Sequence, residues 1–395
     1  MKGNITGGVK MSDSNRTGIY YIEEVTWGET PASALQELRI TGESLGFVID
    51  HMVSGEIRDD RQITDLVQTG AECNGGFNFE LSYGTFDELF EGALWNSWST
   101  TVAVDGSDIS VTAATSTYAS AAIEDFVADG IVVGQWLKFG GFTNSENNGI
   151  KKVTSVTTLT VVVDDAGLVD ESAPASATLD GAYLRNGTEE HSYSIERKHA
   201  DITEFFGFLG MVVNTLELTI AANAAVTGTI EFQGKSASLA QSTIGTGGPT
   251  DATTTEVFNA LSNVGSIEEG GSALSLMIQE ITISIANNVR GIPAVGTLGA
   301  ADIGVGKCDI TGTLNVMFAD DTLYDKYLAN TATSLSFQLT DAAGNVYIFT
   351  IPNIKFESDQ PNAEGQDSDV VENITWRAMR DSTTDCMIQI DRIAA

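Results

Sequence analysis

The sequence predicts a mainly β protein in which one building block occurs twice, and two observations support this. Strand-like runs, in which Thr, Val, Ile and aromatic residues alternate with polar ones, dominate the chain, for example at 216–220, 229–232, 335–339 and 346–351. Turn residues separate these runs, as at the hairpin tip formed by Asp341, Gly344 and Asn345. In addition, two distant stretches of the chain resemble each other.

This internal similarity joins residues 75–90 to residues 312–328, and each stretch is expected to form a strand followed by a short helix. The matched strand residues are Gly75, Phe77, Asn78, Phe79 and Leu81 against Gly312, Leu314, Asn315, Val316 and Phe318. A lead strand is expected upstream of each, at 36–40 and at 279–283. A self-match at so long a spacing indicates a duplicated domain rather than a solenoid.

Each copy is predicted to contain one short helix that packs on a sheet. In the first copy Thr85 is expected to cap the helix, with Glu88 completing a capping box. The spacing of the apolar residues in this helix is that of a single stripe: Phe86, Leu89, Phe90, Ala93 and Leu94. In the second copy the expected stripe is Tyr324, Tyr327 and Leu328, with Asp320, Asp321 and Thr322 as candidate caps.

Composition changes along the chain predict its domain organisation. Residues 99–185 are rich in small residues, Thr and Val, and they have no counterpart in the second copy. We therefore expect a small β domain inserted into the first copy, and a Gly/Ser/Thr-rich linker between the copies. The expected boundaries are 1–98 and 186–240 for the two parts of copy one, 99–185 for the insertion, 241–255 for the linker and 256–395 for copy two.

The charge and cysteine content exclude several classes of function. Asp and Glu number 54 against 20 Lys and Arg, which gives a formal net charge of −34 and argues against ordinary phosphate-neutralising nucleic-acid binding. The three cysteines have no metal-ligand or disulfide spacing. No run of 18 apolar residues occurs, and residues 1–10 lack an apolar core of signal-peptide length. The sequence thus predicts synthesis in the cytosol without membrane insertion.

The candidate interaction site is a charged segment between two expected strands, residues 54–67. It contains Glu56, Arg58, Asp59, Asp60, Arg61 and Asp65. On one interpretation it is a loop that becomes ordered against another copy of the protein, with its arginines pairing acidic groups there. On the other it is a solvated loop, whose surface ion pairs contribute about 0 to 1 kcal/mol each.

No catalytic, cofactor or metal site is predicted. The acidic doublets, such as Asp164 with Asp165, lack the spaced ligands of an EF-hand, and they are assigned to turns and caps. Neither a nucleophile elbow nor a phosphate-binding loop occurs. Trp95, Trp98 and Trp136 could form glycan-stacking platforms, but they are expected to be core or interface residues.

Several segments resemble the tail tube proteins of long-tailed bacteriophages, and the resemblance covers nearly the whole chain. It is carried by Arg16, Tyr20, Glu23, Glu24, Trp27, Gly28, Thr30, Pro31, Leu38, Arg39, Thr41 and Gly42, and above all by Ser54, Glu56, Ile57, Arg58, Asp60, Arg61, Gln62 and Ile63. It continues through Gly134, Trp136, Gly141, Phe142, Asn147, Asn148, Gly149 and 185–188, and then Gly344, Asn345, Tyr347, Ile351, Pro352 and Gly365.

The resemblance implies β-sandwich or incomplete barrel domains, each with a flanking helix, that join edge to edge into a ring. Rings would stack into a virion tail tube that conducts genome DNA, with the inserted domain outside. A chain with two copies would close a pseudo-hexameric ring with three subunits, at a formal charge of −102 per ring. The expected partners are further copies of the chain, the tape-measure protein, the passing DNA, and tail tip and terminator proteins.

Two other functions stay open at this point. A tail-fibre or adhesin module would bind host glycan or protein through exposed aromatic residues. A secreted Ca²⁺-dependent β-hydrolase would require a signal peptide, which the sequence does not show.

Overall fold

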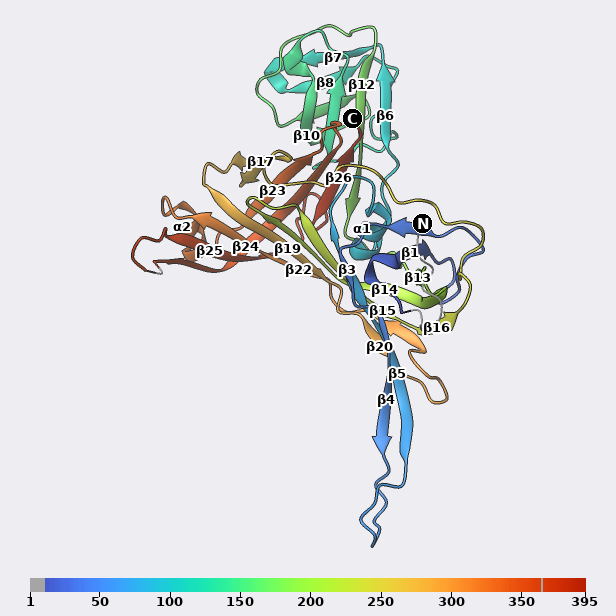
Figure 1. Cartoon of the computed structure of the whole chain (residues 1–395). Helices are drawn as coiled ribbons and strands as arrows, with labels where there is room; N and C mark the ends of the chain where they lie inside the picture. The colour runs from blue at the N-terminus through green and yellow to red at the C-terminus, as the bar shows by residue number, and fades with distance from the viewer. Residues whose placement is uncertain (1–10, 364) are drawn as a thin grey trace, which may run out of the picture.

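The computed structural model describes residues 11–363 and 365–395, and it confirms a mainly β fold. One antiparallel sheet runs through both halves of the chain (Figure 1). The order of its main strands is β4 (Gly46–Val53), β5 (Leu66–Glu80), β15 (Thr227–Gly234), β14 (Glu204–Ala221), β19 (Ile278–Ala286), β22 (Asp309–Met317), β25 (Val371–Ala378) and β24 (Val346–Asn362).

The two halves have the same strand pairing. In the first half β14 also carries β13 (Tyr193–His199) and β16 (Ser236–Ala240), and β13 pairs with β1 (Thr17–Glu23). In the second half β24 also carries β23 (Thr333–Thr340) and β26 (Gln389–Ile393), and β23 pairs with β17 (Val264–Glu269). A register shift interrupts β13–β14 and β23–β24 at corresponding places.

The predicted match between the two lead strands is wrong. β2 (Gln36–Leu38) pairs with β1, whereas residues 279–283 lie in β19 and pair with β22. The strands that pair with β5 as β19 pairs with β22 are β3 (Gly42–Glu43) and β4. A short alternating pattern is common to any half-buried strand, so it does not identify the strand's partner.

The first predicted helix is α1 (Asp87–Leu94), and its apolar stripe is buried as expected. The predicted capping box is wrong, because Phe86 occupies the N-cap position and no side chain caps the helix. The Thr85 hydroxyl lies 2.6 Å from that of Ser82 and also contacts Thr253. Thr85 therefore connects a turn to the linker instead of starting the helix.

The second helix, α2 (Thr322–Leu328), is less buried than predicted. Its buried residue is Leu323, while Tyr324 and Tyr327 are half-buried and Leu328 is exposed. The predicted stripe is therefore displaced around the helix, and part of this face of the subunit stays uncovered.

Residues 102–179 form a separate small hydrophobic core. Its strands are β6 (Val102–Gly106), β7 (Ile109–Thr112), β8 (Thr117–Ser120), β9 (Trp136–Gly140), β10 (Gly149–Val156), β11 (Thr160–Val163) and β12 (Ala177–Arg185). This part stands at one end of the molecule (Figure 1). It is attached to the second half because β12 pairs with β26, and Arg185 Nε donates to Gln389 Oε1 at 2.7 Å.

The two halves share one main core. Phe90 of α1, for example, packs edge-to-face on Phe349 of β24. The remaining short elements are β18 (Ser272–Ala273), β20 (Arg290–Ile292), β21 (Asp302–Gly304) and the 3₁₀ turns Ser14–Arg16, Ala113–Thr115 and Ser145–Asn147. All three cysteines are free thiols. Among the described residues, no helix has the length and apolar character needed to span a bilayer.

Candidate functional site

A long hairpin of β4 and β5 projects from the body, and residues 54–65 form its tip (Figure 1). We call residues 46–72 the arm. The structure brings all six predicted charged residues together at the exposed tip: Glu56, Arg58, Asp59, Asp60, Arg61 and Asp65. Sequence reasoning thus located the segment, and the structure shows how far it extends from the core.

Part of the charge at the tip is already paired within the subunit. Arg58 donates three hydrogen bonds to Asp60, from Nη2 to Oδ2 at 2.6 Å and from Nε to Oδ1 at 2.9 Å and to Oδ2 at 3.2 Å. The hydrogen bonds from Arg58 lower the pKa of the Asp60 carboxyl. Asp65 accepts the backbone N–H of Leu66 at 2.8 Å. Among the described residues, Glu56, Asp59 and Arg61 form no ion pair, so they are the charges left for another molecule.

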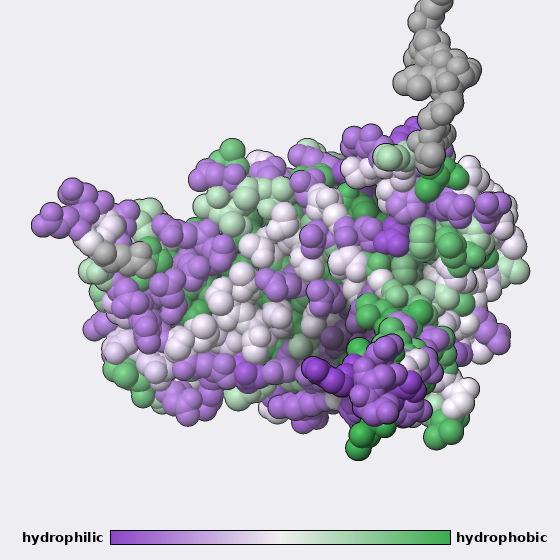
Figure 2. Space-filling view, turned by 60° about the horizontal axis from the view of Figure 1, so that its bottom comes forward, coloured by the Kyte–Doolittle hydropathy of each residue, from purple (hydrophilic) through white to green (hydrophobic). Residues whose placement is uncertain are grey.

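The arm also exposes apolar side chains, which the sequence analysis did not single out. They are Val48, Ile49, Met52, Val53, Ile57, Ile63, Leu66 and Val67. Figure 2 is turned so that this end comes forward, and it shows hydrophilic and hydrophobic side chains side by side there. An isolated two-stranded ribbon is marginal in water, and exposed apolar residues in a group mark an interaction surface. The apolar residues that flank the charged loop, at 47–53 and 63–67, were the available signal.

The solvent face of the continuous sheet is polar and acidic. Along each strand, buried apolar residues alternate with exposed Thr, Ser, Asn and acidic residues. The carboxylates on this face are Glu72, Glu80, Glu217, Glu231, Glu280, Asp309 and Glu357. The cations there are Lys355 and Arg377, and Arg377 is held by Asp309 and by Glu357.

The two outer edges of this sheet are open. Residues 215–219 of β14 pair with β15 on one side, and residues 215–221 pair with β19 on the other, which joins the two halves. Residues 355–362 of β24 occupy the equivalent place in the second half, but among the described residues they pair with β25 alone. At the other end β3 and β4 pair with β5 alone. Open strand edges of this kind accept further strands.

Next to the β24 edge lies a buried pair of carboxyl groups, Asp359 and Glu372, on the core-facing side of β24 and β25. None of their four carboxyl oxygens has a hydrogen-bond donor among the described residues. Burial raises the pKa of Glu372, and the adjacent Asp359 raises it further, to about 8. The pKa of Asp359 is also raised, by burial. Sequence reasoning missed this pair, which no motif marks.

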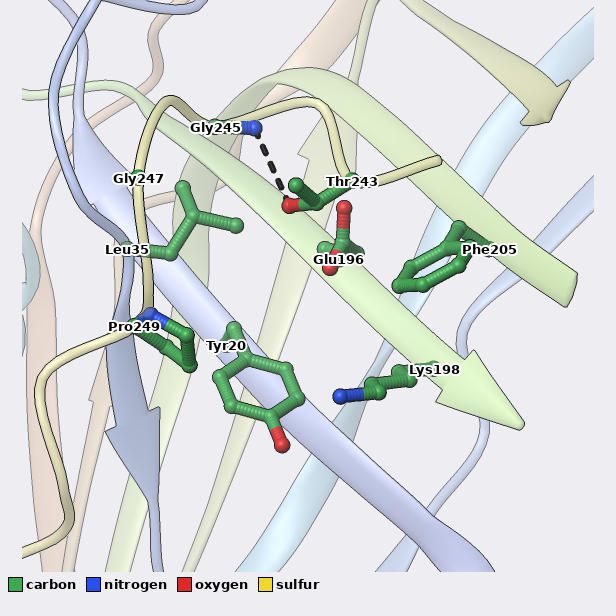
Figure 3. Close-up of a pocket in the computed structure, with 9 residues that line it drawn as sticks. All are labelled: Tyr20, Leu35, Glu196, Lys198, Phe205, Thr243, Gly245, Gly247 and Pro249. Carbon is green, nitrogen blue, oxygen red and sulfur yellow. Dashed lines mark hydrogen bonds between the residues drawn. The ribbon is translucent and has the colours of Figure 1, made fainter. Parts of the chain in front are cut away.

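The pocket beneath the linker is small, about 120 Å³ (Figure 3). Gly245, Gly247 and Pro249 arch over Tyr20 and Lys198 there. Several of its polar groups are used internally, since Glu196 accepts the N–H of Ile244 at 2.7 Å and Gly245 donates its N–H to Thr243 Oγ1 at 3.2 Å. The cavity therefore anchors the linker and presents no built ligand site.

The three tryptophans considered as glycan platforms are packed into the subunit. Trp95 is buried, Trp98 Nε1 donates to the Asp87 carbonyl at 3.1 Å, and Trp136 Nε1 donates to Thr350 Oγ1 at 3.2 Å. Among the described residues, no group of three or more His, Cys, Asp or Glu side chains could hold a metal ion.

Open strand edges at both ends of one sheet, a polar sheet face and a projecting arm are features typical of structural proteins that assemble. The model of the phage tail tube protein family matches residues 14–378, so the chain belongs to this family. No curated protein matches the chain. Membership makes it a structural protein of the virion tail, and confirms the family named from the sequence.

Proposed function

We propose that three copies of this chain close into a ring of six related β domains, and that such rings stack into a tube that conducts DNA. The proposed domains are those expected from the sequence, with residues 256–395 as the second copy and residues 99–185 as a decoration outside the wall. The strand order shared by the two halves supports this division.

The main support for the proposal is the pairing of β14 with β19. This pairing shows, within one chain, how the sheet of one domain joins the sheet of the next. In it Thr215 pairs with Ala286, and Leu216 pairs with Ile285. If domains repeat around a ring, the open edge of β24 meets the open edge of β3 and β4 in the next subunit in the same way.

The shared pairings convert this into a specific register. Gly75 and Gly312 are equivalent because they pair with Phe232 and Trp376 respectively. Glu72 and Asp309 are then equivalent as well, so their partners Val48 and Ala286 occupy equivalent positions. In the same way Ser358 of β24 is equivalent to Thr215 of β14, because their partners in β25 and β15 are equivalent residues.

We therefore expect Ser358 to pair with Val48 of the next subunit. Asp359 then pairs with Phe47 and Gln360 with Gly46, in antiparallel register. This pairing extends the sheet through all three subunits and leaves no open edge.

The polar face of the closed sheet would line the bore. Seven carboxylates against two cations per subunit give this face a negative field, which repels phosphate groups. Arg377 is already held by two carboxylates, so it offers DNA little attraction. Genome DNA and the tape-measure protein would pass without sequence-specific contacts, and the ends of the tube would meet the tail tip and terminator proteins.

The arm would dock the next ring. Its free charges Glu56, Asp59 and Arg61 and its apolar residues Ile57 and Ile63 supply the contacts. Arg58, Asp60 and Asp65 shape the tip in this proposal, since their side chains are bonded within it.

A disulfide tests the ring register directly. In the double variant Val48→Cys/Ser358→Cys, oxidation of assembled protein should produce covalent trimers on a non-reducing gel. Negative-stain images of the same sample should show hollow rings or tubes with threefold symmetry. In the control Val67→Cys/Ser358→Cys, the first cysteine replaces another exposed valine of the arm, and this variant should remain monomeric on the gel. Persistent monomers by microscopy, or hexamers of whole chains, would contradict the proposal.

A further inference from the structure

The first half of the subunit contains a slot that is filled by residues 257–259, which directly follow the linker. Phe258 donates its N–H to the Leu81 carbonyl at 2.8 Å, and its own carbonyl accepts the N–H of Val226 at 2.8 Å. Leu81 and Val226 are also bonded to each other, N to O, at 2.9 Å. All three side chains are fully buried. Residues 257–259 therefore act as a short extra strand that covers this end of the domain.

The second half has the same slot without its strand. Phe318 donates to the Val370 carbonyl at 3.0 Å, which repeats the bond from Leu81 to Val226. Phe318 nevertheless is 40% exposed, and the adjoining Met277 is 76% exposed. Within residues 11–363 and 365–395, no segment takes the place of Phe258 beside Phe318. An apolar slot with a backbone carbonyl and a backbone N–H at its rim fits an extended peptide.

Residues 11–16, before β1, are the counterpart of residues 258–263, before β17. Ala200 donates to the Arg16 carbonyl at 3.0 Å, just as Thr340 donates to the Asn263 carbonyl at 2.7 Å. These bonds make Arg16 equivalent to Asn263, since β1 and β17 pair with the equivalent strands β13 and β23. Counting back the same number of residues leads from Asn263 to Phe258, and from Arg16 to Met11. Met11 is apolar and 83% exposed.

We propose that Met11 and Ser12 of one copy enter the slot beside Phe318 of the adjacent copy, so that neighbours in a ring exchange this part of the chain. This inference rests on the proposed ring. In that ring, the second half of one subunit contacts the first half of the next subunit in the same way as the two halves of one chain contact each other. Met11 then takes the place of Phe258, between the Phe318 carbonyl and the Val370 N–H of the neighbour. The exchange ties each subunit to the next by a strand as well as by a sheet edge.

An engineered disulfide locates the exchanged segment. Asn259, next to Phe258, forms a bridge with Ala225, and the equivalent residues are Ser12 and Asp369 of two different copies. Antiparallel bridge partners have Cα atoms about 4.5 to 5.5 Å apart, within the range of a disulfide. Oxidised tubes of Ser12→Cys/Asp369→Cys should give covalent trimers on a non-reducing gel, whereas each single variant, and Ser12→Cys/Leu261→Cys as an exposed control, should not.

A second variant separates assembly from folding. Met11→Asp should leave the melting temperature of the monomer unchanged, because Met11 is exposed in the subunit. It should raise the protein concentration needed for tube formation at least tenfold, because a charge would enter an apolar slot.

The outcomes distinguish this inference from the ring on which it rests. Covalent trimers from Val48→Cys/Ser358→Cys together with monomers from Ser12→Cys/Asp369→Cys would overturn the exchange and leave the ring intact. Failure of both pairs, with no rings in the microscope, would overturn the ring. A Ser12–Asp369 disulfide within a single chain would show that the segment folds back on its own subunit, which also overturns the exchange.

Discussion

Asp359 and Glu372 show how the two halves differ at single positions within the same strand pairing. Their equivalents in the first half are Leu216 and Gly228, and the ring of Phe79 lies against Gly228. The second half thus has two carboxyl groups where the first half has an apolar contact. Two buried carboxyl groups without donors cannot both ionise at low cost, so one proton stays on the pair at neutral pH.

This pair predicts a pH dependence of stability. The pKa of Glu372 in the folded protein is about 8, well above that of an exposed glutamate. The unfolded chain releases this proton above about pH 4.3, so stability is lost progressively as pH rises from there to about 8. Glu372→Gln should raise the unfolding free energy at pH 8 by about 1 to 3 kcal/mol, and by less at pH 5.

Thermal unfolding between pH 5 and 9 measures this effect. The other charged group that faces the pair is Asp320, whose carboxylate adds repulsion. Glu280→Gln, on the solvent face of the same sheet, is the control and should not change the slope. A Glu372→Gln protein with the pH profile of the unmodified chain would show that the pair does not hold a proton.

Single residues were predictable where periodicity defined them. The stripe of α1 followed from helical spacing, and all of its residues are buried. The capping box was not formed because Thr85 found partners in Ser82 and Thr253, and Thr253 lies far away in sequence. The burial of Asp359 and Glu372 could not be predicted from the sequence, because a polar residue in a strand does not by itself indicate which face of the sheet it occupies.

Among the elements, the arm has the clearest consequence for assembly. Its strands extend beyond the last contact with the body, and among the described residues no third strand pairs with the part beyond the sheet. Ile57 is fully exposed and Ile63 nearly so. Such side chains add nothing to the stability of a free subunit, and they gain free energy only when a neighbour covers them.

Replacing these two residues therefore separates folding from stacking. Ile57→Ser/Ile63→Ser should leave the melting temperature of the monomer unchanged and abolish long tubes, leaving single rings or subunits in negative-stain images. The matched control is Ile123→Ser/Val127→Ser, which removes two exposed apolar side chains from the inserted region. Tubes of normal length from the arm variant would rule out an apolar stacking contact.

Elements were predicted unevenly from the sequence. The charged loop, both helices and most strands were placed correctly, because turn residues and alternation marked them. The pairing of the lead strands was not, because β2 and β19 have the same pattern but different partners. Strand partners depend on contacts across the whole chain, which a local pattern does not contain.

At the scale of the whole molecule, assembly has to overcome the electrostatic repulsion between negatively charged subunits. Each chain carries a formal −34, and in the proposed ring like charges are brought together around a narrow bore. Salt screens such repulsion, with a Debye length that falls from about 30 Å at 0.01 M to 10 Å at 0.1 M. Tube formation followed by light scattering should therefore become faster and more complete as NaCl increases from 10 to 150 mM.

The opposite trend would mean that ion pairs between subunits outweigh the repulsion. In that case Arg61, the free cation of the arm tip, would be the first candidate, and Arg61→Gln should remove the salt sensitivity. Mass measurements at both salt concentrations would verify that the monomer itself does not aggregate.

One difference between the halves sets the geometry of a finished tube. The connection that forms the arm in the first half is replaced in the second half by residues 287–308, where the short β20–β21 hairpin lies beside β15 and the arm's base. Only alternate domains of a six-domain ring would then carry a projection. Successive rings could then dock only in orientations separated by a third of a turn. A rotation applied to the ring at one end of the tail would therefore be transmitted to each following ring.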